Sequence, residues 1–325
     1  MSSSSLPWIE KYRPKRTTDI VLEPNVKREI TNILTNRDLP NIIITGTPGV
    51  GKTTTLLCIA SQLYGKYFSD AVLEINASDD RGIKSVQTTM TEFCNTVLGY
   101  NDDDRKKYAP HKLVILDEAD NITEKAQHLI GILMEKFHAT TRFAFTCNTS
   151  SYIIGSIQSK CKILRYMRID NDQIINRLKF ILNTEKVKYD DDGLQNIAYM
   201  SSGDMRHAIN LTQMTYNRFN SVCIDNVNSI CTLPQPVFIK EILLECLSKD
   251  FKKSLKHIYA LKHSGYTGSD ILLGVMGTLK LPLTADISEK DKMNIINVVC
   301  TYLYNISKSM DTDIQLSSCI AELCK

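Results

Sequence analysis

The stretch NIIITGTPGVGKT, residues 41–53, decides the fold. Its first five residues are mostly apolar and lead to Gly46, which is typical of a short buried strand. Residues 46–53 match the phosphate-binding pattern G-x-x-x-x-G-K-[ST] at every fixed position. A helical pattern over residues 52–64 follows. The motif therefore has the strand, loop and helix that phosphate binding by such a loop requires.

The loop predicts a site for ATP and Mg²⁺. Its glycines let backbone N–H groups turn inward around phosphates, and the N-terminus of the following helix favours anions. Lys52 supplies positive charge to the terminal phosphates, and Thr53 offers its hydroxyl to Mg²⁺. The nucleotide contacts predicted from this stretch and the residue after it are Gly46, Thr47, Pro48, Gly49, Val50, Gly51, Lys52, Thr53 and Thr54.

Two carboxylates follow a second apolar strand pattern, at residues 113–116. Because ligands bind at the carboxyl ends of parallel strands, we expect Asp117 and Glu118 at the sheet edge that carries the loop, one strand further along. Asp117 would hold Mg²⁺ directly or through water. Glu118 would polarise the attacking water as a general base. An acidic turn without function is the alternative, and the phosphate loop earlier in the chain argues against it.

Two further polar residues are candidates for the same site. Asn148 follows the apolar run 143–147 and could hydrogen-bond the attacking water or the terminal phosphate; a simple turn asparagine is the alternative. Arg206 lies in the first turn of a predicted helix, from which it could reach the nucleotide. A solvated surface arginine is the alternative for Arg206.

Strand and helix patterns alternate over the first half of the chain, which predicts an α/β fold with a parallel sheet covered on both faces. The strand patterns cover residues 41–45, 72–75, 113–116, 143–147 and 163–166, and the helix patterns cover 52–64, 83–98 and 124–137. We place this domain at residues 1–166.

Helical patterns alone follow, because the strand signals stop between residues 167 and 230. Helices over 172–184, 191–200 and 204–216, each opened by an Asp cap or an acidic first turn, predict a second domain at residues 167–232. The proline-containing stretch 233–236 is expected to be a linker. Helical patterns at 237–247, 254–263 and 293–307 predict an all-helical domain at residues 233–325.

Composition and charge indicate an intracellular protein without a membrane span. No apolar run reaches about 18 residues, no secretory signal is expected, and the ten cysteines form no C-x-x-C pair that would suggest zinc. The net charge is only +3, but every arginine lies at or before Arg218. Because arginine is the favoured partner of phosphate, nucleic-acid contacts are expected in the first two-thirds of the chain. The last third is expected to be a packing or assembly module.

Five runs of sequence resemble the AAA+ ATPases and, among them, the small subunits of replication factor C, the sliding-clamp loader. They are WIEKYRPK at 8–15, NASDDRGI at 76–83, LDEAD at 116–120, CN at 147–148 and GDMR at 203–206, and they follow the family's order. The resemblance spans most of the chain. It implies an ATPase core, a small helical lid and a helical collar that closes a hetero-pentameric ring with other clamp-loader subunits.

The resemblance also implies a reaction cycle and roles for single residues. In that family, ATP-bound subunits open the sliding clamp and grip primer–template DNA, and hydrolysis releases the clamp around the duplex. Ile9 and Arg13 match the family's contacts to the adenine and phosphate sides of the nucleotide, and Arg206 matches the lid arginine that senses the terminal phosphate. A hydrophobic anchor and a surface ion pair are the alternatives for Ile9 and Arg13. Arg81 matches a position that faces DNA in the central channel, with an ion pair to a neighbouring aspartate as its alternative.

Two positions depart from the family's pattern. Gln87 stands where the family often has a second arginine, six residues after Arg81, which weakens the expected grip on DNA. Lys160 stands where an arginine usually reaches into the neighbouring subunit's ATP site, and lysine keeps the charge but loses the planar fork. The neighbour's site would then be slower, be activated by another residue or be absent. A solvated loop lysine is the alternative.

Three other functions are alternatives to an ATPase subunit that loads clamps. The first is a scaffold subunit of the same ring that binds ATP but turns little of it over. The second is a DEAD-type helicase, suggested by the tetrapeptide at 117–120; the last third offers no second sheet domain with an arginine motif. The third is a GTPase, but the sequence contains no N-K-x-D motif to recognise the guanine base. A clamp-loader subunit would work in the nucleus of a cellular eukaryote or otherwise at a viral replication site.

Overall fold

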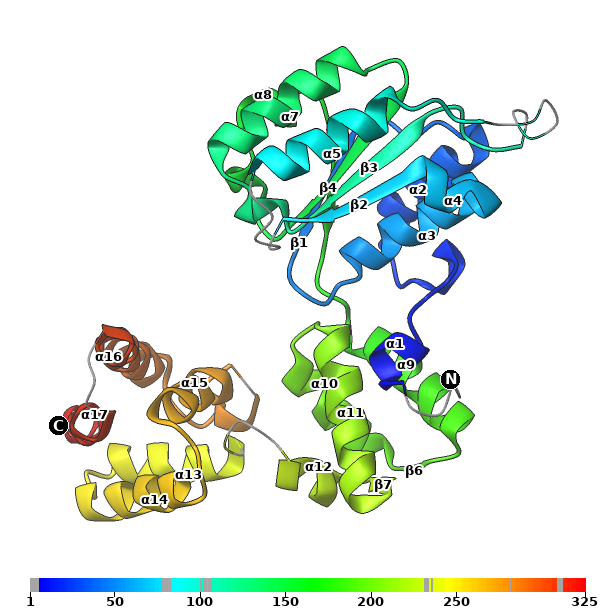
Figure 1. Ribbon diagram of the computed structural model, residues 1–325. Helices are drawn as coiled ribbons and strands as arrows, with labels where there is room; N and C mark the ends of the chain where they lie inside the picture. The colour runs from blue at the N-terminus through cyan, green and yellow to red at the C-terminus, as the bar shows by residue number, and fades with distance from the viewer. Residues whose placement is uncertain are drawn as a thin grey trace. The chain divides into compact units, whose positions relative to one another are not determined.

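The computed structural model describes residues 6–77, 83–99, 101, 104, 107–230, 234, 236–280, 282–308 and 312–325. The chain divides into two compact units, Met1–Ile224 and Asp225–Lys325 (Figure 1). The first unit contains the expected sheet domain and the expected helical lid up to residue 224. The finer domain boundaries at residues 166 and 232 stay predictions.

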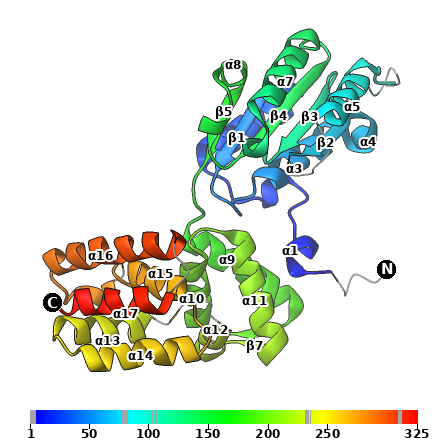
Figure 2. The same cartoon turned by 60° about the vertical axis from the view of Figure 1, so that its left-hand side comes forward.

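A five-stranded parallel sheet forms the centre of the first unit, in the order β2-β3-β4-β1-β5 (Figure 2). Its strands are β1 (Ile42–Gly46), β2 (Val72–Asn76), β3 (Lys112–Asp117), β4 (Thr141–Cys147) and β5 (Lys162–Tyr166). The predicted α/β fold is confirmed. The placement of Asp117 one strand from the phosphate loop is wrong, because β4 lies between β1 and β3. The last residues of β4 therefore lie between the loop and the carboxylates.

Helices cover both faces of the sheet because its strands are apolar on both faces. Ile42 and Ile44 of β1 belong to one core cluster with residues of α2 and α3, while Ile43 belongs to another with residues of α5 and α7. All three isoleucines are fully buried. The helices of this domain are α2 (Pro24–Asn36), α3 (Lys52–Tyr64), α4 (Phe68–Ala71), α5 (Ile83–Asn95), α7 (Glu124–Lys136) and α8 (Gly155–Gln158). Short 3-10 turns connect several of these elements: η1 (Thr17–Asp19), η2 (Gly65–Tyr67), η3 (Ala119–Asn121) and η4 (Ser150–Tyr152).

The lid of the first unit is built from three helices, as expected, and from a small sheet that was not expected. The helices are α9 (Asn171–Glu185), α10 (Asp191–Ser201) and α11 (Met205–Phe219), and the strands are β6 (Lys188–Tyr189) and β7 (Ser221–Val222). The two strands pair in parallel, which corrects the expectation that strands stop after residue 166. Strands of two residues are too short to show an alternating pattern. Asp170, Asp190 and Asp204 cap the three helices.

The N-terminal helix α1 (Trp8–Lys11) attaches to this lid. The Trp8 ring stacks on Tyr216 of α11 with 5.4 Å between centroids, and Trp8 N–H donates to Gln213 Oε1 at 2.9 Å. On α9, Glu185 accepts hydrogen bonds from Lys11 and Tyr12, both at 2.6 Å. The segment that carries Ile9 and Arg13 is therefore fixed on the lid.

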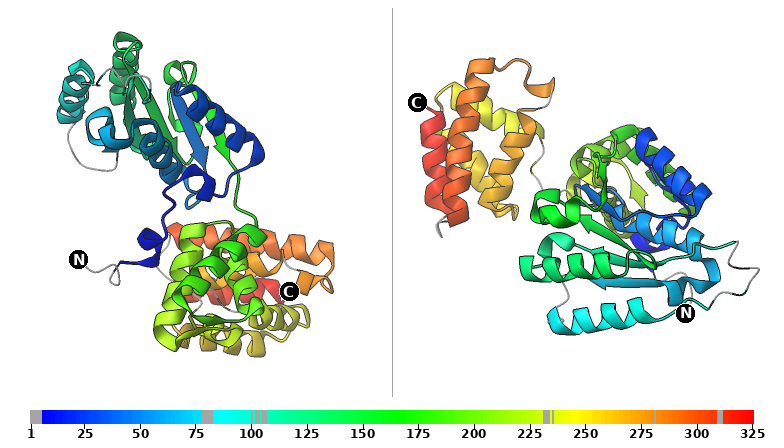
Figure 3. Two further views of the ribbon diagram at one scale, coloured as in Figure 1. Left: turned by 90° about the vertical axis from the view of Figure 1, so that its right-hand side faces the viewer. Right: turned by 90° about the horizontal axis from the view of Figure 1, so that it is seen from above.

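The second unit is helical throughout the residues that are described. Its helices are α12, which begins at the unit boundary (Ile224–Ile230), α13 (Pro236–Leu247), α14 (Phe251–His263), α15 (Gly268–Thr278), α16 (Glu289–Lys308) and α17 (Thr312–Leu323), with one 3-10 turn, η5 (Pro282–Thr284). Residues of α13 to α17 share one apolar core (Figure 3, yellow to red). Two residues of the predicted linker, Leu233 and Gln235, lie outside the described part, and Pro236 begins α13. None of the described helices combines the length and apolar character needed to span a membrane.

His111, directly before β3, is a buried histidine whose surroundings disfavour the protonated, charged form of the ring. Its side chain is 2% exposed, and its Nε2 has no hydrogen-bond partner among the described residues. Nδ1 lies 3.9 Å from Asp38 Oδ1, which is too far for a hydrogen bond. Burial, helped by the Arg142 charge, lowers the pKa of His111 from 6.5 to about 4. The folded protein therefore holds His111 neutral at physiological pH.

Acid is expected to destabilise the first unit through this residue. The unfolded chain takes up the proton below about pH 6.5 and the folded chain only near about pH 4, so the free energy of unfolding falls by about 3 kcal/mol across that window. Urea denaturation at both ends of the window should show this loss for the native chain and a smaller one for His111→Phe. His128→Phe, at an exposed position of α7, is the control. Equal pH dependence in all three proteins would contradict the assignment.

Candidate nucleotide-binding site

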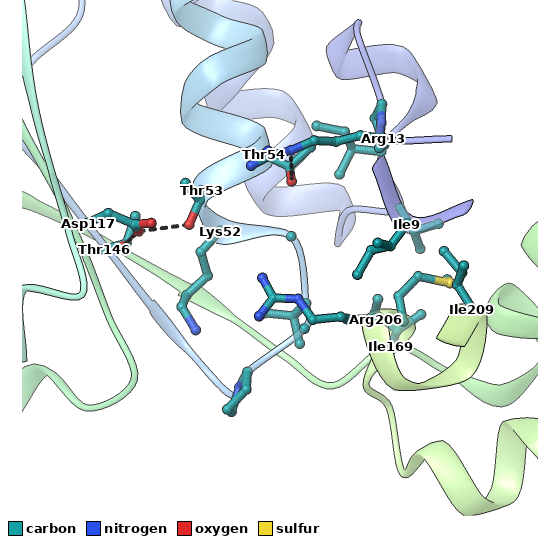
Figure 4. A pocket seen from close by; sticks show the side chains of 18 of the residues that line it. Ile9, Arg13, Lys52, Thr53, Thr54, Asp117, Thr146, Ile169, Arg206 and Ile209 are labelled. Atoms are coloured by element: carbon teal, nitrogen blue, oxygen red, sulfur yellow. Dashed lines mark hydrogen bonds between the residues drawn. The ribbon is translucent and has the colours of Figure 1, made fainter. Parts of the chain in front are cut away.

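A cavity of about 390 Å³ lies at the carboxyl ends of β1, β3 and β4 in the first unit (Figure 4). Its walls also include the N-terminal segment and residues of the lid helices α9 and α11. The predicted site residues that line it are Ile9, Arg13, Pro48, Gly49, Val50, Gly51, Lys52, Thr53, Thr54, Asp117, Glu118, Asn148 and Arg206. The structure thus brings residues from five separate stretches of sequence to one cavity.

Two glycines of the loop could not be replaced without displacing their neighbours. A Cβ on Gly46 would lie 2.6 Å from the Tyr166 carbonyl oxygen of β5. Gly49 has a φ of +72°, and a Cβ there would overlap the carboxylate of Asp204. The loop therefore needs glycine at both positions, which leaves its backbone open to a ligand above the first turn of α3.

Lys52, the first residue of α3, points its ammonium into the loop. Nζ donates to the carbonyl oxygens of Gly46 at 2.7 Å and Thr47 at 2.9 Å, and to Asn148 Oδ1 at 2.9 Å. Burial lowers the pKa of Lys52, while nearby groups including Asp117 act in the opposite direction. Phosphate oxygens are stronger acceptors than these neutral groups. The cavity at Lys52 therefore fits the phosphates of a nucleotide.

Asp117, at the end of β3, receives two hydroxyl groups on one carboxylate oxygen. Thr53 Oγ1 donates to Asp117 Oδ1 at 2.8 Å, and Thr146 of β4 donates to the same oxygen (Figure 4). A carboxylate and a threonine hydroxyl at this distance are the oxygen donors that Mg²⁺ prefers. This pair is where the chain could hold the metal.

Glu118 has an unusual backbone conformation. Its φ is +53°, in the left-handed region that non-glycine residues seldom adopt. Its N–H donates to Thr146 Oγ1 at 3.1 Å, and its Oε2 accepts from Asn121 Nδ2 at 3.4 Å. The side chain is exposed on the cavity wall. Glu118 is therefore open to water at the site, in a strained conformation of the kind found at functional positions.

The lid reaches the phosphate loop through the start of α11. Met205 N–H donates to the Gly49 carbonyl oxygen at 3.3 Å, and Asp204 caps α11 by accepting from His207 N–H at 3.0 Å. Arg206, one residue into the helix, projects toward the loop (Figure 4). The lid arginine and the loop lysine therefore face the same cavity.

The N-terminal segment contributes the remaining predicted contacts. Arg13 Nε donates to Thr54 Oγ1 at 3.4 Å, and its Nη1 lies 3.5 Å from Glu10 Oε2. Ile9 lines the cavity with other aliphatic residues (Figure 4). Arg13 thus forms an ion pair with Glu10, which is the alternative given for it above. It also lies beside α3, where it contacts Thr54.

Several cavity residues were missed by the sequence analysis. The clearest are Thr146, Asp120, Arg177 and the aliphatic residues Ile20, Val21, Ile169 and Ile209. Arg177 of α9 donates to the Tyr12 carbonyl oxygen at 2.7 Å, and burial lowers the pKa of Arg177. Asp120 and Thr146 could have been found from their places beside Glu118 and Asn148. Arg177 lies inside a helix without any local signal.

Three predicted residues do not line the cavity: Gly46, Thr47 and Lys160. Lys160 is not on the cavity wall; its Nζ lies 2.6 Å from Glu135 Oε1 of α7 and 3.5 Å from the Gly131 carbonyl oxygen. Arg81 lies outside the described residues, and so does the side chain of Gln87.

Comparisons with known proteins agree with this architecture. Residues 42–176 match the ATPase family associated with various cellular activities (AAA), residues 176–216 an AAA+ ATPase lid domain, and residues 234–322 the replication factor C C-terminal domain. Among solved structures, the Holliday junction branch migration motor RuvB of Thermotoga maritima covers 72% of this chain and 78% of its own, with a TM-score of 0.55 and 18% identity. That likeness concerns the fold alone.

Fold and site together define an AAA+ ATPase domain, which binds nucleotide. A putative replication factor C small subunit of Acanthamoeba polyphaga mimivirus is 39% identical over 99% of this chain and 98% of the relative. Replication factor C subunit 4 of Saccharomyces cerevisiae is 37% identical over 99% of this chain and 97% of the relative. The chain belongs to the replication factor C small-subunit family, the clamp-loader subunits of DNA replication.

Proposed function

We propose that this chain hydrolyses ATP with Mg²⁺ at its own site and uses the cycle to open a sliding clamp and load it onto primer–template DNA. The observation that carries the proposal is the convergence of Lys52, Asp117 and Glu118 on one cavity. A subunit that only binds ATP needs the lysine but not the exposed glutamate. The cycle would take place where the genome is copied, in a cell nucleus or at a viral replication site.

Each residue has a defined task in this proposal. Lys52 exchanges the carbonyl groups of Gly46 and Thr47 for phosphate oxygens. Thr53 and Asp117 would hold Mg²⁺, which would supply positive charge against the phosphates when bound. Glu118 accepts a proton from the attacking water as general base.

The remaining residues orient the nucleotide. Asn148 uses Oδ1 to accept from Lys52 Nζ, which leaves its amide N–H groups for a phosphate oxygen or the water. Arg206 and Arg13 supply further positive charge. Ile9, Ile20 and Ile209 form an apolar wall that suits the adenine ring.

Two contacts beyond this chain's own site complete the proposal. Arg81 would touch a DNA phosphate, which positions a duplex without reading its sequence. Lys160 would extend into the ATP site of a neighbouring subunit. To reach it, Lys160 must leave Glu135, whose pKa is lowered by the hydrogen bond and charge of that lysine.

Co-expression with the other replication factor C subunits of the same genome tests the proposal. The chain is expected to purify in a pentamer whose ATP turnover rises about tenfold or more when primed DNA and the sliding clamp are added together. Steady-state phosphate release measures the turnover. A chain that stays monomeric, or a pentamer indifferent to both additions, would contradict it.

A further inference from the structure

The backbone of Asn148 is held by two side chains from neighbouring elements. Its N–H donates to Asp120 Oδ2 at 3.1 Å, and its carbonyl accepts from Thr45 Oγ1 at 3.2 Å. Asp120 belongs to η3, the turn that follows the two carboxylates, and Thr45 belongs to β1. Asn148 is thus fixed on both sides of its backbone, at the residue whose side chain meets Lys52 Nζ.

Asp120 lies in a hydrogen-bonded turn, but only one of its two carboxylate oxygens has a hydrogen-bond partner among the described residues. Its turn is closed by the hydrogen bond from Asn121 N–H to the Glu118 carbonyl oxygen at 3.0 Å. Its second carboxylate oxygen, Oδ1, is buried and has no hydrogen-bond partner among the described residues. A buried, unpartnered carboxylate oxygen is costly, so residues that serve only the fold seldom have one. This cost points to a role at the site.

We infer that Asp120 is a positioning residue for ATP hydrolysis: by fixing the Asn148 backbone, it keeps the Asn148 amide in place for the terminal phosphate and the attacking water. The inference rests on the proposed function of this site. Asp120 does not have to touch the nucleotide for this role. It links the turn that carries Glu118 to the strand end that carries Asn148, so general base and amide keep a fixed separation.

Two substitutions at Asp120 separate the hydrogen bond from the charge. Asp120→Asn and Asp120→Ala remove the same negative charge, but only the asparagine keeps an oxygen that can accept from Asn148 N–H. A difference between the two variants in hydrolysis rate and in the ATP-to-ADP affinity ratio therefore reports the hydrogen bond. A change common to both reports the lost charge near Lys52.

The test measures single-turnover ATP hydrolysis in the assembled ring, and ATP and ADP binding to the full chain with fluorescent nucleotides. We expect Asp120→Ala to hydrolyse ATP about 30-fold more slowly than Asp120→Asn, and to bind ATP about fivefold more weakly, because about 1–2 kcal/mol of positioning is lost. ADP, which lacks the terminal phosphate, should bind both variants within about twofold of each other by the same reasoning.

Two further variants make the test specific. Thr45→Val removes the second bond to Asn148 with a residue of similar shape that suits a strand, and it should slow hydrolysis in the same direction as Asp120→Ala. Asp70→Asn, at an exposed position of α4, is the matched control and should leave both measurements unchanged.

The outcomes are distinct. Equal hydrolysis rates and equal ATP-to-ADP affinity ratios in Asp120→Ala and Asp120→Asn would overturn the inference. So would a parallel loss of ATP and ADP affinity with earlier thermal unfolding in Asp120→Ala, which indicates a purely structural role. If the native ring and a Glu118→Gln ring turn over ATP equally, the proposed function fails instead. The affinity ratios still decide for or against the positioning by Asp120 in that case.

Discussion

Replacing Glu118 by glutamine is expected to slow ATP turnover at this site by about a thousandfold, the scale of a lost general base. Glutamine keeps the size of the side chain and an oxygen that can accept from Asn121. It has no carboxylate to take a proton from water. The backbone bond from residue 118 to Thr146 is unaffected, so the left-handed turn should remain.

ATP affinity separates this result from a general disruption of the site. The Glu118→Gln chain should bind ATP within about twofold of the native chain, because Lys52, the residue proposed to contact the phosphates, is unchanged. Titration with a fluorescent ATP analogue measures this affinity. Glu124→Gln, at the exposed start of α7, is the control and should change neither quantity. A comparable loss of affinity and turnover in Glu118→Gln would argue against a role for Glu118 as the base.

Replacing Lys52 by alanine should mainly weaken ATP binding, whereas Glu118→Gln should mainly slow ATP turnover. The ammonium makes three hydrogen bonds, to the loop carbonyl oxygens of Gly46 and Thr47 and to Asn148. Hydrogen bonds to charged groups are worth about 1.5–3 kcal/mol, so ATP affinity is expected to fall about a hundredfold. Calorimetric titration of the full chain with ATP measures the change.

A matched lysine shows whether the effect is local. Lys125→Ala removes an exposed lysine of α7 and should leave ATP affinity unchanged. Thermal unfolding of Lys52→Ala should stay close to that of the native chain, since the hydrogen bonds of Lys52 to described residues all go to the loop and Asn148 at the cavity, and not to the apolar core. An affinity that stays near the native value would mean that the nucleotide does not sit against the phosphate loop.

The sequence was sufficient to predict the strands of the sheet and several residues that line the cavity, because both depend on local patterns. Residues 41–53 contain a buried strand, a glycine loop and a helix start in one continuous stretch, and the structure has β1 and α3 there. Asp117 and Asn148 could be found because each directly follows an apolar run of sequence, 113–116 and 143–147. Strands β6 and β7 were missed because two residues cannot show a period.

What the sequence could not predict depends on contacts between distant residues. Thr146 touches Asp117 and Glu118 only because β4 lies beside β3. No local sequence pattern predicts this strand order. Arg177 reaches the cavity wall from the middle of α9 through the lid packing. The ion pair between Lys160 and Glu135 likewise joins distant residues, one in the turn after α8 and the other in α7.

The central claim, that this subunit hydrolyses ATP itself, is tested most directly by counting ATP molecules consumed in a single clamp-loading cycle. Rings assembled with Glu118→Gln in this subunit alone are compared with native rings by rapid quench, with primed DNA and clamp present. The proposal predicts that the burst of phosphate falls by one ATP per ring. An unchanged burst would contradict it and would assign this chain to nucleotide binding without turnover.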